Sequence, residues 1–459
     1  MHSQNITMRT NRYDVTDWPV GNAFDDIGVV INSMIAHVKD RQSSRDAASG
    51  GRPGAVIYIP PGDYRLTTQI VIDISYLRIE GSGHGFTSSS IRFNTPGEDL
   101  QTWHELWPGG SRIKNEIPID SIRSDADGAA ILVRRSGDPR ISSVEFVDFC
   151  IDGLHFVETA STVGDSENSY RNGKTGILIE SANDSFRVIG MGLIYLEHGL
   201  VCHKSDALTV DSNFIAECGN CVELRTMGQA CRISNNLVGA GYDGHSLYVE
   251  NYGGVLVSGN NIFPRGASSI HLSGVVRSSV TGNRLHSFYP GMLVIDKGSS
   301  ENLVSANHLL RDREPWKPMM GYNNGKDDTF GLVRIEGTNN SVLSNHISLS
   351  IDQQYVVPTG SRPAIICLES GSGNYISNNH VVATTNRQAS SSFADADCFD
   401  SQVEALLSVA SLQPLEVVAV RIREGVEGNT VLDSGTDGQV ELDRSRNAFR
   451  ATPGLAPPQ

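Results

Sequence analysis

The phrase VDSNFI (210–215) recurs six times further along the chain, as ISNNLV (233–238), VSGNNI (257–262), VTGNRL (280–285), VSANHL (304–309), VLSNHI (342–347) and ISNNHV (376–381). The Asn residues at 213, 236, 260, 283 and 307 are 23, 24, 23 and 24 residues apart, and the steps to 345 and 379 are 38 and 34. VIGMGL (188–193) places Met191 at the same phase. Because a period in the low twenties with short strands and no helical pattern is typical of a solenoid, we expect stacked coils.

The strand-like phrases favour an all-β solenoid over a leucine-rich repeat, which would need LxxLxL phrases that this sequence lacks. We therefore predict a single-stranded, right-handed parallel β-helix, similar in architecture to pectate lyase. One coil cannot bury its apolar edge alone, so stacked coils share a continuous core. Asn at a fixed turn position can adopt left-handed geometry and form a ladder of amides from coil to coil. The repeated asparagines are thus expected to be structural.

The ends of a solenoid must be covered, because open strand edges aggregate. Residues 1–53 are expected to form an N-terminal segment with a capping helix at about 22–39. Its apolar residues recur at helical spacing, and Asp25 and Asp26 are expected in its first turn; they are Phe24, Ile27, Ile31, Met34, Ile35 and Val38. The β-helix is expected over 54–440, with an inserted loop at 384–413 that forms a lid or a subunit contact. A C-terminal tail is expected over 441–459.

Composition excludes several classes of protein. The chain has 459 residues, of which 39% are hydrophobic and 46 are Gly; 52 acidic minus 37 basic residues give a net charge of −15. Because nucleic-acid binding depends on Lys and Arg, that partner is not expected, whereas a neutral sugar is compatible. No run approaches the roughly 20 apolar residues of a membrane span. The N-terminus, MHSQNITMRTNRYDVTDW, lacks the pattern of an export signal, which favours the cytoplasm.

Cysteine spacing gives no indication of a metal or cofactor. The chain has seven Cys, and Cys218 and Cys221 have CxxC spacing without the second pair of a zinc site. Asp327 and Asp328 in YNNGKDD (322–328) suggest a calcium ligand set only weakly, and a plain loop is the expected reading. We expect no metal and no cofactor.

Residues at equal phase in successive coils stack into a column. Positions +4 to +6 after the repeat Asn, with their immediate neighbours, contain acids, Arg and aromatic residues; they include Glu197, His198, Glu217, Arg265 and Tyr289. Such side chains, stacked about 4.8 Å apart, predict a sugar-binding cleft. A solvated column of turns is the alternative.

Glycosidic chemistry usually needs two carboxyl groups. Asp206 and Glu217 flank one strand in SDALTVDSNFIAEC (205–218) and are the leading pair. The alternatives on spacing alone include Glu197, Asp211, Glu223 and Asp243.

Ten phrases, in order, resemble the inulin fructotransferase family: IPPGDY (59–64), GHGF (83–86), NGKTG (172–176), YLEH (195–198), SDAL (205–208), AECGNCVEL (216–224), GQA (228–230), NNIFPRG (260–266), FYPGML (288–293) and LDSGT (432–436). The resemblance spans roughly residues 20 to 440. It implies a β-helix homotrimer with active sites near subunit interfaces. It also implies cleavage of fructan linkages by a hydroxyl of the same fragment, which forms a difructose dianhydride. A sister activity opens difructose anhydride III with water to give inulobiose.

The family's catalytic Asp and Glu fall on Asp206 and Glu217. Five further residues are expected to contact the substrate: Glu197, His198, Gln229, Arg265 and Tyr289.

Two departures favour the hydrolase over the fructotransferase. The fructan-cleaving members carry an export signal, and this sequence shows none. The 384–413 insertion, which includes Cys398, is expected to close the cleft to a polymer and to hold a water. A different class of interpretation is a non-catalytic trimeric β-helix, such as a tailspike stalk. A pectin-type lyase would need a basic cleft or calcium, which a chain at −15 does not favour.

Overall fold

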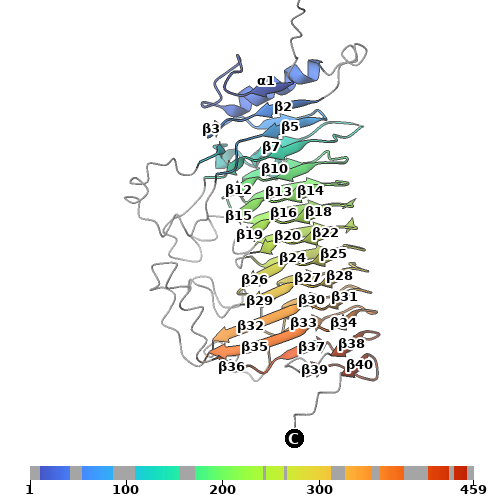
Figure 1. Ribbon diagram of the computed structural model, residues 1–459. Helices are drawn as coiled ribbons and strands as arrows, with labels where there is room; N and C mark the ends of the chain where they lie inside the picture. Colours follow the sequence, from blue (N-terminus) through green and yellow to red (C-terminus); the bar gives the residue numbers. More distant parts are fainter. Residues whose placement is uncertain are drawn as a thin grey trace, which may run out of the picture.

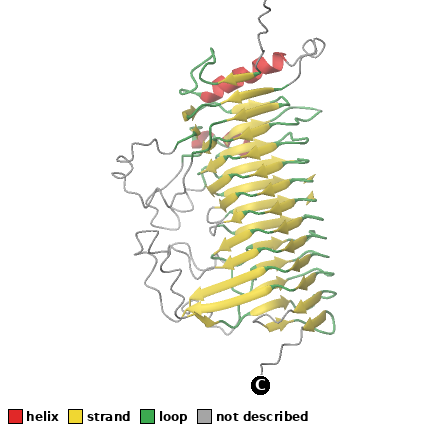
Figure 2. Cartoon of the chain, viewed as in Figure 1, coloured by secondary structure: helices red, strands yellow, loops and turns green. Residues whose placement is uncertain are grey.

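The computed structural model describes residues 11–41, 54–85, 109–137, 139–154, 171–240, 244–262, 266–311, 326–352, 362–386, 412–433 and 439–451. Over these residues the chain is a parallel β-helix with three long sheets, as Figures 1 and 2 show. We call them sheet A, with 14 strands, and sheets B and C, with 12 strands each. The predicted fold class is confirmed.

The strands of sheet A, in spatial order, are β1 (Arg12–Asp14), β2 (Ala55–Tyr58), β5 (Leu77–Glu80), β8 (Glu145–Val147), β11 (Arg187–Ile189), β14 (Thr209–Asp211), β18 (Arg232–Ser234), β22 (Leu256–Ser258), β25 (Ser279–Thr281), β28 (Leu303–Ser305), β31 (Ser341–Leu343), β34 (Tyr375–Ser377), β38 (Thr430–Asp433) and β40 (Ala448–Ala451). Those of sheet B are β3 (Gly62–Leu66), β6 (Ser111–Asn115), β9 (Cys150–Asp152), β12 (Gly192–Ile194), β15 (Phe214–Cys218), β19 (Leu237–Ala240), β23 (Asn261–Ile262), β26 (Arg284–Ser287), β29 (His308–Arg311), β32 (His346–Asp352), β35 (His380–Asn386) and β36 (Leu412–Pro414).

Sheet C contains β4 (Ile70–Ile72), β7 (Ala129–Val133), β10 (Thr175–Ile179), β13 (His198–His203), β16 (Asn220–Arg225), β20 (His245–Glu250), β24 (Ser268–Ser273), β27 (Leu293–Ile295), β30 (Val333–Ile335), β33 (Ala364–Leu368), β37 (Val418–Ile422) and β39 (Gln439–Glu441). A small pair joins β17 (Gly228–Gln229) to β21 (Tyr252–Gly253).

One coil runs from sheet C to sheet A to sheet B and back to sheet C, for example β13, β14, β15, β16. We call the three connections the C/A corner (204–208 in this coil), the A/B corner (212–213) and the B/C corner (217–219). Val210, Ile215 and Val222 point inward from the three sheets and are fully buried. Because every coil contributes such residues, one core runs along the axis.

The predicted asparagine ladder is present at the A/B corner. Each amide donates to the side-chain oxygen of the next, at 2.8–3.0 Å; the members are Asn213, Asn236, Asn260, Asn283, Asn307, Asn345 and Asn379. The left-handed backbone, however, belongs to the residue before each Asn, for example Ser212 and Ala306. All seven amides are buried, so the ladder satisfies polar groups that would otherwise be costly.

A second ladder, which the repeat phrase did not reveal, lies at the C/A corner. It links Asn302, Asn340, Asn374, Asn429 and Asn447 at 2.9–3.3 Å. Two corners of the lower solenoid are therefore fixed by buried amides.

Helix α1 (Ile27–Arg41) covers the N-terminal end of the core, as predicted. It buries Ile27, Ile31, Met34, Ile35 and Val38. Asn32 donates to the backbone oxygen of Gln69 (2.8 Å) and accepts from the backbone N–H of Val71 (2.9 Å), which satisfies the open edge at β4.

Three details at this end differ from the prediction. The helix begins after Asp25 and Asp26, and Asp26 accepts from the backbone N–H of Gly28 (3.0 Å). Phe24 is 48% exposed and stacks on Tyr64 outside the helix. Strand β1, inside the predicted capping segment, pairs with β2.

At the C-terminal end, parallel pairing continues past the predicted boundary at 440. Strand β39 pairs with β37, and β40 pairs with β38 up to Ala451. The region assigned to the tail, 441–459, therefore contains the last strand of sheet A.

The longer steps of the repeat lie at the B/C corner. Residues 312–325 follow β29, 353–361 follow β32 and 387–411 follow β35, and each of these strands belongs to sheet B. The predicted insertion at 384–413 lies outside the described residues except at its base, where β35 and β36 pair antiparallel from Thr384 to Asn386. These three additions thus follow strands of the same sheet.

In the described residues, no helix has the length and apolar character that a membrane crossing requires.

Candidate active site

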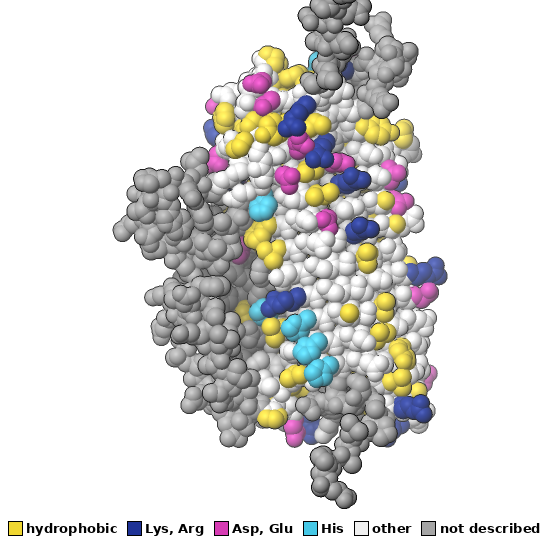
Figure 3. Space-filling model, viewed as in Figure 1, with side chains coloured by type: hydrophobic (Ala, Val, Ile, Leu, Met, Phe, Trp, Pro, Cys, Tyr) yellow, Lys and Arg dark blue, Asp and Glu magenta, His cyan; other side chains and the backbone are white. Residues whose placement is uncertain are grey.

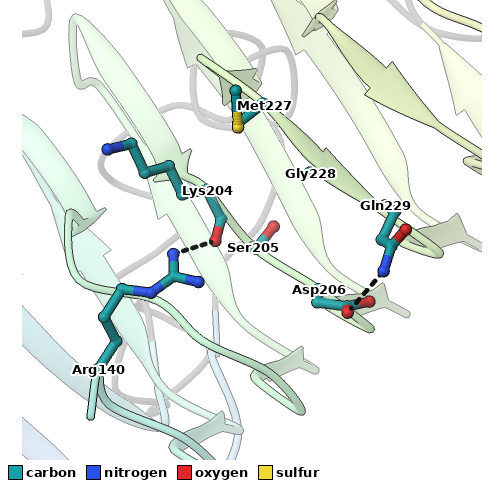
Figure 4. A pocket seen from close by; sticks show the side chains of 7 residues that line it. All are labelled: Arg140, Lys204, Ser205, Asp206, Met227, Gly228 and Gln229. Atoms are coloured by element: carbon teal, nitrogen blue, oxygen red, sulfur yellow. Dashed lines mark hydrogen bonds between the residues drawn. The ribbon is translucent and has the colours of Figure 1, made fainter. Parts of the chain in front are cut away.

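Asp206 lies at the C/A corner, between β13 and β14. Its backbone bridges to Asp184 in one neighbouring coil and to Gln229 in the other. The Gln229 side-chain N–H donates to Oδ2 of Asp206 at 3.0 Å, as Figure 4 shows. The hydrogen bond fixes the orientation of a carboxylate at the surface. The structure thus brings together two of the residues predicted for the site.

A depression of about 630 Å³ opens beside Asp206. It is lined by Arg140, Lys204, Ser205, Asp206, Met227, Gly228 and Gln229 (Figure 4). Arg140 donates to the backbone oxygen of Lys204 at 3.1 Å. Two cationic groups, a carboxylate, an amide and the 61% exposed Met227 offer polar and apolar contacts together, as a sugar ring requires.

Glu217 lies at the B/C corner, in β15. Its φ is +55°, and the pairing with β19 shifts register between Ala216 and Cys218, so Glu217 occupies a bulge. Both neighbours are buried, whereas Glu217 is half-buried. Bulges often re-aim a side chain next to an active site.

Within one chain, Asp206 and Glu217 do not meet. They lie at opposite ends of a sheet C strand, and β16 has six residues. Five steps of about 3.3 Å give a separation of about 16 Å or more. Carboxyl pairs of glycosidases lie at most about 9.5 Å apart. The expectation that they flank one strand is wrong in geometric terms, since the chain runs through β14 and into β15 before it reaches Glu217.

Glu197 and His198 lie at the same corner as Glu217, one coil earlier. The backbone N–H of Asn220, three residues after Glu217, donates to the backbone oxygen of Glu197 at 2.7 Å. The Glu197 carboxylate accepts from the backbone N–H of Gly173 at 2.6 Å. The structure therefore groups Glu197, His198 and Glu217, as the stacking argument predicted.

His198 belongs to a network of charges on the outer face of sheet C. Its Nδ1 lies 2.5 Å from Oε1 of Glu223, and its Nε2 lies 3.7 Å from Oδ1 of Asp125. Arg225 donates to Glu223 at 2.8 Å and to Asp125 at 2.7 Å. Asp125 belongs to the short helix α5 (Asp125–Gly128), so the network ties a distant segment to the strands.

The network shifts each member toward its charged form. Burial acts to lower the pKa of His198, but the hydrogen bond and charge of Glu223, aided by Asp125, raise it above the usual value. Burial acts to raise the pKa of Glu223, yet His198 and Arg225 hold it below the usual value. The network therefore favours the charged forms of both side chains.

Further polar side chains continue down sheet C in register with Glu223. The register runs from Glu223 to Tyr248 to His271. His271 lies 2.6 Å from Oδ2 of Asp296, and His245 lies 2.7 Å from the Ser268 hydroxyl. Burial, together with the nearby His271, lowers the pKa of His245 to about 4. Sequence reasoning missed this column, although single polar residues inside the apolar phrases SLYVE (246–250) and SIHLS (269–273) signal it.

The remaining predicted contacts have other outcomes. Tyr289 is fully buried at the B/C corner, and its contact with substrate stays a prediction. Arg265 lies outside the described residues. Arg311, which donates to the backbone oxygen of Phe288 next to Tyr289, is also buried and forms an ion pair with Asp328 at 2.8 Å. Asp328 and Asp327 therefore have structural partners, since Asp327 accepts from the Thr329 backbone at 2.7 Å.

Among the side chains that the structure describes, no three His, Cys, Asp or Glu are arranged to hold a metal. Cys218 and Cys221 are both free and fully buried. The CxxC spacing therefore reflects two thiols packed in the core.

Two family models match the chain. One, described as the beta helix repeat of inulin fructotransferase, matches residues 306–453. The other, described as the periplasmic copper-binding protein NosD, matches residues 113–325. A tailspike protein is 14% identical with a TM-score of 0.54, and this likeness bears on the fold alone.

Individual relatives are similar over most of the chain. An inulin fructotransferase (DFA-I-forming) from Arthrobacter globiformis is 42% identical over 385 residues, 82% of this chain and 90% of the relative. The crystal structure of a DFA-IIIase mutant from Arthrobacter chlorophenolicus A6, in complex with DFA-III, has a TM-score of 0.88 at 59% identity, with 97% of this chain and 100% of that chain covered. The same enzyme without its lid has a TM-score of 0.83 at 55% identity, with the same shares covered.

These similarities agree with the parallel β-helix that the structure shows. The chain is an enzyme that belongs to the inulin fructotransferase family, with DFA-IIIase among its relatives.

Proposed function

We propose that this enzyme is a glycoside hydrolase that opens difructose anhydride III (DFA-III) with water to give inulobiose. The observation that carries the proposal is the similarity to DFA-IIIase, at 58–59% identity over 97% of the chain. The lower identity to the DFA-I-forming fructotransferase, 42%, leaves intramolecular transfer on inulin as the second candidate.

Hydrolysis of a fructosyl linkage needs an acid and a base. One carboxyl group protonates the oxygen that leaves the anomeric carbon, and the other removes a proton from the water that adds to that carbon. Asp206 and Glu217 are the proposed pair. We assign Glu217 as the general acid/base because it is half-buried in a bulge between two buried residues, and Asp206, whose carboxylate accepts a hydrogen bond from Gln229, as its partner.

The separation of about 16 Å inside one chain requires that the two carboxyl groups come from different copies. We therefore propose a homotrimer in which Asp206 of one copy and Glu217 of the next form each site. In a cyclic trimer every interface is the same, so three equal sites result.

The insertion 384–413 is the proposed lid. Its base lies at the B/C corner, which is also the corner of Glu217. Along the axis, the base at β35 is six strands of sheet B beyond β15, the strand that contains Glu217. Six spacings of about 4.8 Å are about 29 Å. Residues 387–411 number 25, and half of them, extended, reach about 40 Å. The lid can therefore reach the site and shield it from a polymer.

The activity test is an incubation of the purified protein with DFA-III and, separately, with inulin, followed by chromatography. Inulobiose from DFA-III with little action on inulin is the expected result. Release of a dianhydride from inulin would instead establish the fructotransferase.

Co-expression of two inactive variants tests the shared site. Asp206→Asn and Glu217→Gln are each expected to lose turnover. In randomly mixed trimers, about one quarter of the interfaces would pair an intact Asp206 with an intact Glu217, so about a quarter of the activity should return. A site formed within one chain would lack one carboxylate in either variant, so mixing the variants would restore no activity. The absence of any recovery would therefore contradict the proposal.

A further inference from the structure

A buried tyrosine lies directly behind the segment that contains Asp206. Tyr252 begins β21, two coils further along the C/A corner. It is fully buried, so it lies beneath the side chains that a space-filling view such as Figure 3 displays. Its hydroxyl oxygen accepts from the backbone N–H of Ser205 at 3.2 Å and lies 3.1 Å from the Ser205 hydroxyl. The phenol therefore contacts the residue that precedes Asp206.

Gly228 leaves the space through which the ring of Tyr252 reaches Ser205. Gly228 pairs in register with Tyr252, and it belongs to the coil between Ser205 and Tyr252. A Cβ atom at Gly228 would lie 2.2 Å from Cε1 of Tyr252 and 2.2 Å from the backbone oxygen of Ser205. Glycine is therefore required here by close approach. The missing side chain brings together two residues that are 47 apart in sequence.

The segment that Tyr252 contacts is short and lies between two left-handed residues. Lys204 has a φ of +56° and Ala207 a φ of +50°. Neither is glycine, so the surrounding contacts must hold this backbone in place. Ser205 is 1% exposed, whereas the carboxylate of Asp206 lies at the rim of the depression (Figure 4). The contact with the phenol is thus the buried side of a segment whose outer side is the proposed site.

The surroundings of Tyr252 keep its phenol neutral. Burial raises the pKa of Tyr252, and the nearby Cys202 adds to this shift. A neutral phenol has one proton to donate and lone pairs that accept. It can therefore accept from the Ser205 backbone while it donates to the Ser205 hydroxyl or to the backbone oxygen of Cys202, 3.5 Å away. Because a buried N–H without an acceptor is costly, the phenol favours one position of the Ser205 peptide.

The hydroxyl of Tyr252 takes over where the asparagine ladder of the C/A corner stops. The last amide of that ladder, Asn302, accepts from the backbone N–H of Ser278 at 3.0 Å. By the register of sheet A, the same position in the next three coils toward the N-terminus is Val255, Cys231 and Leu208. These three side chains carry no amide, so the corner at Asp206 needs a different buried hydrogen bond.

From these contacts we infer that Tyr252 is a positioning residue for the reaction at Asp206. It acts through Ser205, whose peptide it fixes from inside the solenoid, while the Gln229 amide fixes the Asp206 carboxylate from the neighbouring coil. The backbone and the side chain of the reacting residue are then held by two separate coils. The inference rests on the proposed function, since it takes Asp206 as a reacting group.

Tyr252→Phe tests the contact, because it removes the hydroxyl and keeps the buried ring. Since small displacements of a reacting group are costly, we expect kcat for DFA-III to fall about tenfold, with KM changed by less than about twofold. Tyr64→Phe is the matched control. Tyr64 is also fully buried, and it donates to the backbone oxygen of Pro60 at 2.9 Å, near the N-terminal helix. Both variants should lose some Tm, but only Tyr252→Phe should lose kcat.

A double-mutant cycle separates positioning from a merely structural role. If Tyr252 acts through Asp206, adding Tyr252→Phe to Asp206→Asn should change the residual kcat/KM by less than about twofold. Losses that multiply in the double variant would overturn the inference, and so would full kcat in Tyr252→Phe. If Tyr252→Phe does not fold, Ser205→Ala takes its place. It removes the hydroxyl contact and keeps the N–H, so it should lose less kcat, and again none in the Asp206→Asn background.

Failure of the proposed function would be visible separately. The comparison uses whichever substrate the wild-type protein converts, so release of a dianhydride from inulin would overturn the hydrolase and leave this cycle to be measured on that reaction. Full turnover in Asp206→Asn would instead refute Asp206 as a reacting group, and the inference with it.

Discussion

The Gln229 amide donates to the Asp206 carboxylate across two neighbouring coils, at 3.0 Å. The backbones of the same two residues form a parallel β-bridge, which stacks one residue on the other. A surface carboxylate is thereby held in one orientation by the regular geometry of the solenoid, at the rim of the depression in Figure 4.

Loss of the hydrogen bond from Gln229 to Asp206 should lower activity without unfolding the protein. We expect Gln229→Leu to reduce kcat/KM for DFA-III by about 10- to 100-fold, and Asp206→Asn by about 10³-fold, as for loss of a general acid–base group. Asp184→Asn is the control, because Asp184 is the carboxylate one coil away in the same column. Steady-state kinetics would decide; equal losses in Asp184→Asn and Asp206→Asn would argue for a general charge effect instead.

The buried amide ladder should be a major source of stability. Asn283 donates to Asn307 and to the backbone oxygen of Val257, and it accepts from Asn260. Asn283→Ala leaves several buried groups without partners, each costing about 1–3 kcal/mol, so we expect a loss of about 3 kcal/mol. Urea midpoints would measure it. Asn261→Ala, at a half-buried outer position of β23, should change the midpoint little.

The sequence alone predicted the features that depend on the period. The equal spacing of Asn213, Asn236 and Asn260 implies that successive coils have the same geometry. The coils, the asparagine ladder and the corner shared by Glu197 and Glu217 could therefore be predicted from the spacing. The steps of 38 and 34 also located extra residues after β29 and β32. A second ladder has the same two steps, from Asn302 to Asn340 to Asn374, and was a signal available in the sequence.

Features that depend on contacts between distant segments could not be predicted. The Asp125–Arg225 ion pair joins residues 100 apart in sequence, and no period relates them. Phase gives the corner of a residue but not its depth, so the burial of Tyr289 could not be predicted. The spacing of Asp206 and Glu217 along the chain likewise did not show that they occupy different corners.

The His198 network predicts a stability that falls at high pH. The pKa of His198 is raised on folding, so its contribution is complete below the unfolded value of about 6.5 and is lost as pH rises through the folded value. Glu223 has a lowered pKa, so its contribution is lost only as pH falls well below about 4. His198→Gln should therefore lower Tm more at pH 5.5 than at pH 9. A Tm loss that is the same at both pH values would contradict the raised pKa of His198.

His245, two strands further along sheet C, should have the opposite pH dependence. Burial, aided by the charge of His271, lowers its pKa to about 4, so the folded state resists protonation. Its contribution to stability is complete above the unfolded pKa of about 6.5 and is lost as pH falls toward 4; the shift corresponds to about 3 kcal/mol. His245→Gln should flatten the unfolding free energy between pH 6.5 and 4.5. His37→Gln, on the N-terminal helix, is the control and should leave that slope unchanged. An unaltered slope in His245→Gln would contradict the lowered pKa of His245 as the source of this acid sensitivity.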